Sequence, residues 1–197
     1  MFQNRSRSTN PRLLRIIGVD GGAVSSAREG KTALLVVLLA GPRILDVRTG
    51  EIGVDGLDAQ RVLVSLLKPL SYDIVMLSGI SFAGFNLVDL KLLAREVGKP
   101  VIAVIRERPD NKAVRDALRK HFRDWRQRWR AVKDAGRLYS CRPIPDEPKL
   151  YFEARGCSPS SARRMIVSSS AVSRLPEPVR VAGIVARGMS GPPVKIP

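Results

Sequence analysis

Histidine and cysteine are scarce in this chain of 197 residues, which has one histidine and two cysteines. Cys141 and Cys157 show neither the spacing of a zinc site nor a disulfide framework, and His121 has no Cys or His neighbour at ligand spacing. Reduced thiols are the default expectation, although the two would pair if the fold brought them together. The composition therefore excludes a zinc-finger or disulfide-stapled architecture.

Long apolar runs are missing as well. The apolar run Ala33–Ala40 is far shorter than the roughly 20 residues that a membrane-spanning helix needs. Residues 1–11 are polar and basic, and no apolar core of a signal peptide follows them. We therefore expect an intracellular, cytoplasmic protein without a membrane span.

Acidic residues are also scarce relative to basic ones. The chain has 18 Asp and Glu against 34 Lys and Arg, which gives a formal net charge of +16 and a pI near 11.0. An excess of this size favours anionic partners, with nucleic acid first and an anionic membrane surface second. The alternative is a solvated basic surface that has no cognate ligand.

The length and the hydrophobic content of 44% suit one compact domain. We expect a flexible basic tail over residues 1–11, a single domain over residues 12–190 and a short tail over residues 191–197. No internal repeat or clear linker divides the chain.

The pattern of residues 13–52 predicts three strands joined by short loops, and this arrangement implies an antiparallel meander. Leu13–Val19 reads as the first strand, and Ile44–Ile52 alternates with period 2. Lys31–Ala40 is almost continuously apolar and predicts a central strand buried on both faces.

Further strands and five helices follow along the chain. Residues 73–78 and Val101–Ile105 predict buried strands, the second of the parallel type. Two more short strands are predicted at Leu138–Cys141 and Leu150–Ala154. Helices are predicted over residues 58–68, 86–97, 112–135, 158–169 and 176–189.

Two aspartates are candidate metal ligands. Asp20 ends the first buried strand and precedes Gly21 and Gly22, so a rigid carboxylate would stand where glycines let a phosphate backbone approach. Asp55 precedes the first helix, where the loop could turn its carboxylate inward. The alternative for each is an Asp that only forms a turn. Asp58 looks like a helix N-cap or first-turn acid.

The segment from Ser78 to Asn86 is the first candidate for a binding loop. It follows a buried strand, and loops at the carboxyl ends of strands in open α/β sheets are where ligands bind. Gly79 and Gly84 could equally serve only a tight turn. Arg106 and Arg108 follow the next strand, where they would bind a phosphate if the two strands are neighbours.

Residues 112–135 predict a strongly basic helix that carries Trp125 and Trp129 on one face. In one interpretation both indoles anchor the helix to the sheet and the arginines are solvated; in the other they form a stacking and phosphate-binding surface for nucleic acid. We favour the first. His121 lies at a break in this helix and is expected at the surface or in a cap. The arginines concerned are Arg123, Arg126, Arg128 and Arg130.

Several motifs in order resemble the archaeal endonuclease dU family, formerly known as a domain of unknown function. The resemblance covers nearly the whole chain after the tail, and the Gly-Phe-Asn loop is its most specific part. The motifs are IGVDGG at 17–22, VDGLDA at 54–59, LSGISFAGFNLVD at 77–89, KPVIAV at 99–104 and PEPVRVA at 176–182. The family is similar to endonuclease V.

The resemblance implies an α/β, ribonuclease-H-like mixed sheet: three antiparallel strands, then parallel strands, with helices on both faces. It implies a DNA-repair endonuclease that cuts DNA, single- or double-stranded, near deaminated bases and deoxyuridine in particular. The implied cofactor is Mg²⁺, with Mn²⁺ as an alternative, because strand-end carboxylates in this group hold metal ions that activate water.

Carried over to this sequence, the resemblance makes Asp20 the first-strand metal ligand and Asp55 or Asp58 a further ligand or support. Asp20, Asp55 and Ser78 occupy the implied catalytic positions. The implied nucleic-acid-binding residues are Gly79, Phe82, Gly84, Asn86, Arg106 and Arg108.

Two departures from the family pattern matter. Members usually carry an acid at the position of Gly21 and an Asp at the position of Ser78, and that Asp aligns with a metal ligand of endonuclease V. A hydroxyl is a poorer Mg²⁺ ligand than a carboxylate. The chain would therefore be a slow enzyme, complete its metal site with substrate phosphates, or bind nucleic acid without cleaving it. Asp89 is expected one turn into the next helix, too far to compensate.

Overall fold

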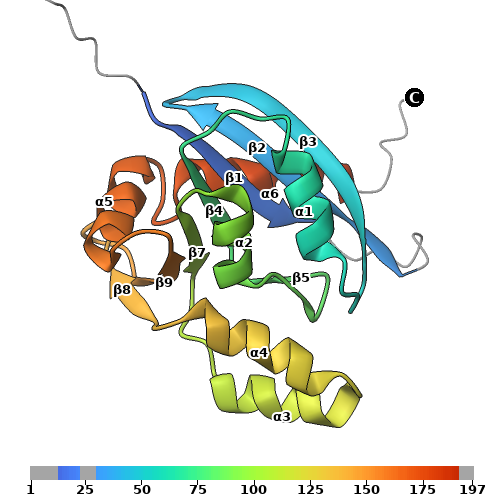
Figure 1. Cartoon of the computed structure of the whole chain (residues 1–197). Helices are drawn as coiled ribbons and strands as arrows, with labels where there is room; N and C mark the ends of the chain where they lie inside the picture. The colour runs from blue at the N-terminus through green and yellow to red at the C-terminus, as the bar shows by residue number, and fades with distance from the viewer. Residues whose placement is uncertain (1–12, 23–29, 191–197) are drawn as a thin grey trace, which may run out of the picture.

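A mixed sheet of seven strands runs through the molecule in the order β3-β2-β1-β4-β7-β9-β8 (Figure 1). The computed structural model describes residues 13–22 and 30–190, so the predicted tails over 1–11 and 191–197 lie outside the described residues. The sheet strands are β1 (Arg15–Gly21), β2 (Lys31–Ala40), β3 (Arg43–Gly53), β4 (Ile74–Ser78), β7 (Val101–Ile105), β8 (Tyr139–Cys141) and β9 (Leu150–Arg155).

The first three strands form the predicted antiparallel meander. β1 pairs with β2, and β2 pairs with β3, both antiparallel. Eight consecutive residues of β2, Thr32–Leu39, are buried, because α1 (Ala59–Leu67) packs on one face and α6 (Glu177–Ser190) on the other. Burial on both faces explains why this strand is apolar throughout rather than alternating.

The centre of the sheet is parallel. β1 pairs with β4 in the register Val19↔Leu77, and β4 pairs with β7 in the register Ser78↔Val104. Parallel neighbours end at the same edge, so the residues that follow these three strands come together there. β9 then closes this side antiparallel to β7, and β8 pairs with β9.

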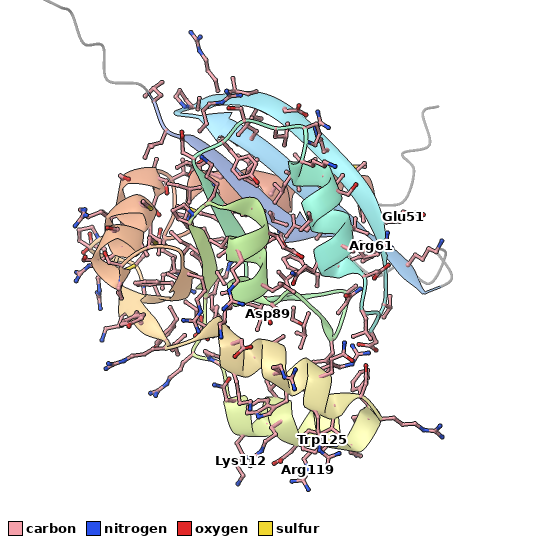
Figure 2. The ribbon with its side chains drawn as sticks, viewed as in Figure 1. Glu51, Arg61, Asp89, Lys112, Arg119 and Trp125 are labelled. Carbon is pink, nitrogen blue, oxygen red and sulfur yellow. The ribbon has the colours of Figure 1, made fainter. Side chains whose placement is uncertain are left out.

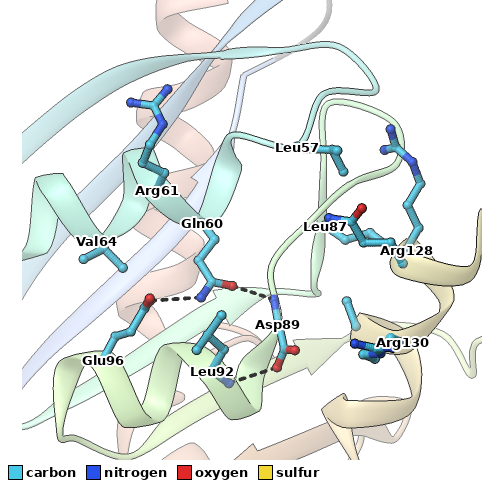
Figure 3. A pocket seen from close by; sticks show the side chains of 12 residues that line it. Leu57, Gln60, Arg61, Val64, Leu87, Asp89, Leu92, Glu96, Arg128 and Arg130 are labelled. Carbon is cyan, nitrogen blue, oxygen red and sulfur yellow. Dashed lines mark hydrogen bonds between the residues drawn. The ribbon is translucent and has the colours of Figure 1, made fainter. Parts of the chain in front are cut away.

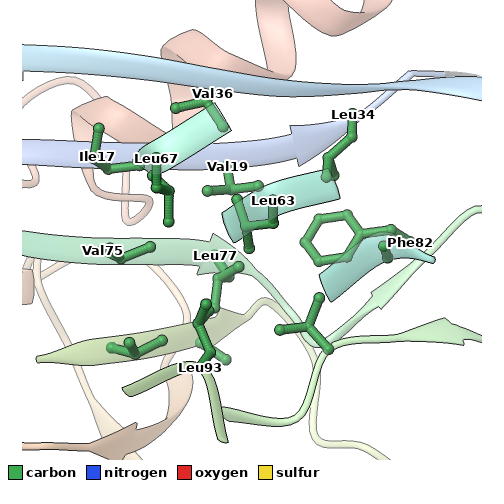
Figure 4. Packing of buried hydrophobic residues seen from close by; sticks show 14 of the residues in the cluster. Ile17, Val19, Leu34, Val36, Leu63, Leu67, Val75, Leu77, Phe82 and Leu93 are labelled. Atoms are coloured by element: carbon green, nitrogen blue, oxygen red, sulfur yellow. The ribbon is translucent and has the colours of Figure 1, made fainter. Parts of the chain in front are cut away.

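Helices cover both faces of the sheet, as expected. Alternation along each strand sends Val19 and Leu77 into the core under α1 and α2 (Leu90–Val97), which Figure 4 shows. Ile16 and Met76 point the other way, into the core under α5 (Pro159–Ser169) and the start of α6. Side-chain parity therefore decides which residues of a strand reach which face.

The predicted helix start at Asn86 is wrong. Residues Asn86–Leu87 form a short strand, β6, which pairs antiparallel with β5 (Ser81–Phe82), and α2 begins only at Leu90. Asp89 is the N-cap of α2, and its side chain accepts a hydrogen bond of 2.9 Å from the Leu92 amide. The carboxylate of Asp89 is thus committed to capping.

The predicted helix over residues 112–135 is a helical hairpin of α3 (Asn111–His121) and α4 (Trp125–Ala135). The residues that α4 buries are Arg128, Ala131 and Ala135. The indoles of Trp125 and Trp129 instead contact arginines of α3. The expectation that both tryptophans anchor the helix to the sheet is therefore wrong, while His121 is exposed at the end of α3 as predicted.

Arg128 was expected to be solvated, but only 6% of its surface is exposed. Its Nη1 donates to the backbone oxygens of Phe85 (2.7 Å) and Gly56 (3.0 Å), and its Nη2 donates to the Asp55 oxygen (2.9 Å). Its Nε donates to Asp124 Oδ1 at 3.0 Å. This one side chain therefore ties α4 to two loops that lie more than 40 residues away in sequence.

In the described part of the chain, no helix is long and apolar enough to cross a membrane, and Cys141 and Cys157 are free thiols.

Replacing Arg128 with Met should destabilise the fold by about 3 kcal/mol, because three backbone carbonyls lose the charged donor of a buried side chain at once. Urea unfolding measures the loss. Arg130→Met, an exposed neighbour on the same helix, is the matched control and should change the free energy of unfolding by less than about 0.5 kcal/mol. Equal effects of the two variants would contradict the anchoring role.

Glu153 in β9 makes the stability depend on pH. Only 6% of this residue is exposed, and burial raises the pKa of its carboxyl from 4.5 to about 7 against the opposing effect of Arg155. The folded state holds the proton more tightly than the unfolded state, so the free energy of unfolding should fall as pH rises from about 4.5 to about 7. Glu153→Gln should shrink this fall in urea unfolding at pH 5 and pH 8; an unchanged fall would refute the assignment.

Candidate functional site

Asp20, Ser78 and Arg106 meet at the carboxyl edge of the parallel strands. Asp20 lies near the end of β1, Ser78 ends β4, and Arg106 follows β7 directly. Asp20 follows Val19 and Ser78 follows Leu77, which are paired across β1 and β4, so both side chains leave the sheet on the face opposite the α1 core. That face is covered by α6. These three predicted residues therefore lie together, as expected from their positions at the ends of neighbouring strands.

The Asp20 carboxyl lies among cationic and hydrogen-bonding groups. Burial raises its pKa above the ordinary range, and this effect outweighs the groups that favour the anion. Those groups are the Gly21 amide, which donates to Oδ1 at 2.8 Å, the Arg187 guanidinium, the Ser78 hydroxyl and the Arg106 guanidinium. The site therefore combines one carboxylate, one hydroxyl and two guanidinium groups.

Helix α6 contributes Arg187, which sequence reasoning missed. A Cβ on Gly183 would stand 2.5 Å from Asp20 Oδ2 and 3.2 Å from Arg187 Nη1, so a glycine lets the helix lie against the carboxylate. Gly183 and Arg187 are four residues apart and share one side of the helix. That pair was the only local signal available, because α6 lies some 160 residues beyond Asp20.

Asp55 holds the loop between β5 and β6. It adopts a positive φ of 54°, its amide donates to Ala83 O at 2.8 Å, and its Oδ1 accepts from the Phe85 amide at 2.7 Å. Its carboxylate also occupies the space that a Cβ on Gly84 would need, which explains a glycine there with φ 77°. Of the two roles expected for Asp55, ligand or support, these contacts describe a support.

Asn86 and Asp58 form a buried polar junction. Asn86 Oδ1 accepts from the Ala59 amide at 2.9 Å, and Nδ2 donates to Gly53 O (2.8 Å) and Asp58 Oδ1 (2.6 Å). Asp58 occupies the N-cap position of α1, but its carboxylate accepts from the Gly53 amide instead of capping. Asn86, more than 25 residues away, satisfies the first amide of the helix instead.

Two of the residues expected to bind nucleic acid are buried in this structure. The side chain of Asn86 is fully buried and that of Phe82 is 3% exposed within the α1 core, so both shape the loop from inside rather than facing a ligand. Gly79 and Gly84 have positive φ and permit the loop to turn. Arg106 and Arg108 are exposed and remain available to a phosphate.

A separate cavity of about 540 Å³ lies on the other face, between α1, α2 and α4 (Figure 3). Gln60 bridges its wall: Nε2 donates to Glu96 Oε2 at 2.9 Å, and Oε1 accepts from the Asp89 amide at 3.0 Å. Gln60 therefore links α1 to both ends of α2 at this junction of three helices. None of the residues that line it belongs to the Asp20 cluster.

The cluster around Asp20 offers a divalent metal few protein ligands. Among residues 13–22 and 30–190, no group of three or more His, Cys, Asp or Glu side chains could hold an ion. Asp20 supplies one carboxylate, and Mg²⁺ in phosphate-transfer sites is often held by one or two carboxylates together with substrate phosphates. The residues therefore fit an ion shared with a bound phosphate and do not fit an ion held by the protein alone.

Comparison with known proteins decides the family. The model of the family described as Endonuclease dU matches residues 12–190. The chain belongs to the endonuclease dU family. A UPF0215 protein of Pyrococcus furiosus is 36% identical over 181 residues, which cover 89% of this chain and 91% of that protein. A UPF0215 protein of Methanosarcina mazei is 35% identical and covers 90% and 91% of the two chains.

Solved structures confirm the expected ribonuclease-H-like fold of this family member. A protein of unknown function from Archaeoglobus fulgidus has a TM-score of 0.80 at 28% identity, covering 89% of this chain and 98% of its own. Human ENDOV has a TM-score of 0.61 at 17% identity, covering 90% and 84%. Endonuclease V of Ciona intestinalis, solved with a 24mer DNA containing an inosine, has a TM-score of 0.59 at 16% identity, covering 90% and 85%.

Ser78→Asp should create a metal site that the wild type lacks in the absence of DNA. A second carboxylate beside Asp20 should tighten Mn²⁺ binding at least about tenfold, because affinity follows the number of charged ligands. Isothermal titration of the DNA-free protein measures this change. Ser81→Asp, an exposed position in β5, adds the same charge and serves as control. Equally tight binding by wild type and Ser78→Asp would refute the donor-set argument.

Proposed function

We propose that this chain is an endonuclease that cuts a DNA strand at or near deaminated bases, deoxyuridine in particular. The observation that carries the proposal is the cluster of Asp20, Ser78, Arg106 and Arg187 at the parallel strand ends of an endonuclease dU family member. The excess of positive charge supports an anionic substrate. The DNA complex of the Ciona endonuclease V shows that this fold accommodates DNA in a structural neighbour.

In this proposal each side chain of the site has a distinct role. Arg106 and Arg187 bind and orient the scissile phosphate, because guanidinium groups match phosphate oxygens with paired donors. Asp20 Oδ1 accepts a hydrogen bond from the Gly21 amide, and Oδ2 lies against Gly183 of α6, so the helix and the loop together position this carboxylate. Ser78 donates to this carboxylate and fixes its orientation.

A divalent ion would be held by Asp20 and by the DNA phosphate itself. When bound, Mg²⁺ or Mn²⁺ would polarise the phosphoryl oxygen and lower the pKa of an attacking water. The protein's own part is then to place the phosphate against Asp20 and to neutralise its charge with Arg106 and Arg187.

The second candidate function is binding of nucleic acid without cleavage. Ser78 favours it, because a hydroxyl replaces the second expected carboxylate. Gly21 favours it as well, because it stands where the family usually carries an acid; a Cβ there would meet Phe82 Cδ1 at an ordinary contact of 3.5 Å.

A cleavage assay on single- and double-stranded deoxyuridine oligonucleotides with Mg²⁺ or Mn²⁺ tests the proposal. Wild type should cut, and Asp20→Ala should lower the rate at least about a hundredfold, since the only carboxylate of the cluster is gone. Asp146→Ala, an exposed acid between β8 and β9, is the matched control and should keep full activity.

Ser78→Asp separates the two candidate functions in the same assay. An inert wild type whose Ser78→Asp variant gains activity would contradict the endonuclease proposal and favour binding without cleavage. If wild type, Asp20→Ala and Ser78→Asp are all inert, the family activity does not extend to this chain.

A further inference from the structure

The α3–α4 hairpin is a strongly basic part of the fold outside the strand-end site. Residues 111–135 carry nine Lys and Arg against three Asp, so about an eighth of the chain supplies more than a third of its net charge. Figure 1 shows the two helices lying together beyond the layers that flank the sheet. The hairpin thus presents a basic surface that the proposed catalytic cluster does not use.

The tryptophans of α4 hold arginines of this surface in place. The guanidinium of Arg119 lies 5.4 Å and that of Arg126 4.8 Å from the centroid of the Trp125 ring, and Arg115 lies 6.0 Å from that of Trp129. Figure 2 shows Arg119 and Trp125 together on the outer side of the hairpin. A ring neutralises little of the charge and leaves the N–H donors in the guanidinium plane free.

Carboxylates do not compensate Arg119 and Arg126. Among the described residues neither side chain forms an ion pair with an acid, whereas the buried Arg128 pairs with Asp124. Arg119 and Arg126 are both exposed. Two preorganised, uncompensated guanidiniums on one ring are suited to bind an external anion with repeated phosphates.

The hairpin is also fixed to the loop that begins at Ser78. Arg128 binds the carbonyl of Phe85, and the Phe85 ring packs edge-on against Phe122, with centroids 5.5 Å apart and an interplanar angle of 74°. The Arg128 guanidinium lies 4.3 Å from the centroid of the Phe122 ring. Binding at the hairpin would therefore hold a strand in a defined relation to the strand-end site.

We propose that the α3–α4 hairpin is a second DNA-binding surface, which takes the sugar-phosphate backbone through arginines held on Trp125. The inference deepens the proposed function and rests on it for the identity of the polyanion. It predicts contact with DNA irrespective of sequence or lesion, because the donors on this surface address phosphates and not base edges.

The chain provides its own reporter for this surface. Its two tryptophans, Trp125 and Trp129, both lie on α4, so intrinsic tryptophan fluorescence responds to the hairpin and not to Asp20. The titration uses a fluorescein-labelled oligonucleotide without deoxyuridine, in EDTA, so neither cleavage nor lesion recognition takes part. We expect a saturable fluorescence change with the same Kd as fluorescence anisotropy gives.

The charge variant is Arg119→Gln/Arg126→Gln. It should weaken binding at least about tenfold at low salt and reduce the slope of log K against log salt by about 2, because two phosphate contacts are lost. Arg163→Gln/Arg164→Gln removes the same charge from exposed positions on α5 and is the matched control, with a nearly unchanged slope.

Three outcomes would overturn the inference: DNA binding without a tryptophan signal, equal slopes for the two double variants, or a tryptophan signal from poly-glutamate but not from DNA. The last would assign an acidic protein partner. The hairpin inference and the endonuclease proposal can fail independently of each other. An inert wild type that still gives the tryptophan response keeps the hairpin surface, while intact deoxyuridine cleavage with unchanged slopes removes the hairpin surface alone.

Discussion

Parallel pairing of β1 with β4 is the constraint on which the candidate site depends. The register Val19↔Leu77 places Asp20 beside Ser78, on the same face and at the same edge of the sheet. A slip of one residue would turn Asp20 into the apolar core under α1 and withdraw it from Arg187. The buried apolar residues of both strands fix this register. The same packing that forms the core therefore also positions Asp20 beside Ser78.

The strands were predictable because their signal is local. Lys31–Ala40 and Val101–Ile105 have the bounds that the apolar runs indicate, and the antiparallel meander follows from the short loops between its strands. The start of α2 was not predictable in the same way. Asn86 is held by Gly53 and Ala59, so contacts more than 25 residues away decide its conformation.

In the candidate site, too, the residues with a local sequence signal were predictable and those placed by tertiary contacts were not. Asp20, Ser78 and Arg106 were found because each lies at or directly after the end of a strand, and strand ends are positions that a sequence pattern reveals. Arg187 and Arg128 come from helices, whose pattern tells which side is apolar but not what faces it. Arg128 even lies in a run of arginines that predicts a solvated surface, and only the carbonyls of other loops explain its burial.

The hairpin illustrates how a correct pattern can carry the wrong consequence. The four-residue spacing of Trp125 and Trp129 does put both indoles on one side of α4, as predicted. The side is not the one that faces the sheet, because Arg128, Ala131 and Ala135 occupy that position. Periodicity fixes which residues share a face, but the identity of the neighbouring element comes from the tertiary fold.

The charge of the strand-end site depends on whether position 78 carries Ser, as in this chain, or the Asp that is usual in the family. Asp20 contributes one negative charge, and Arg106 and Arg187 contribute two positive charges, so the cluster with Ser78 has an excess of one positive charge. An aspartate at this position would make it neutral, and anion binding would then need a cation as well. Under the proposed function, a phosphodiester, which carries one negative charge of its own, would neutralise the positive excess that Ser78 leaves in the cluster. Gly183 preserves the approach of α6 that makes this possible, because any larger side chain would come between Asp20 and Arg187.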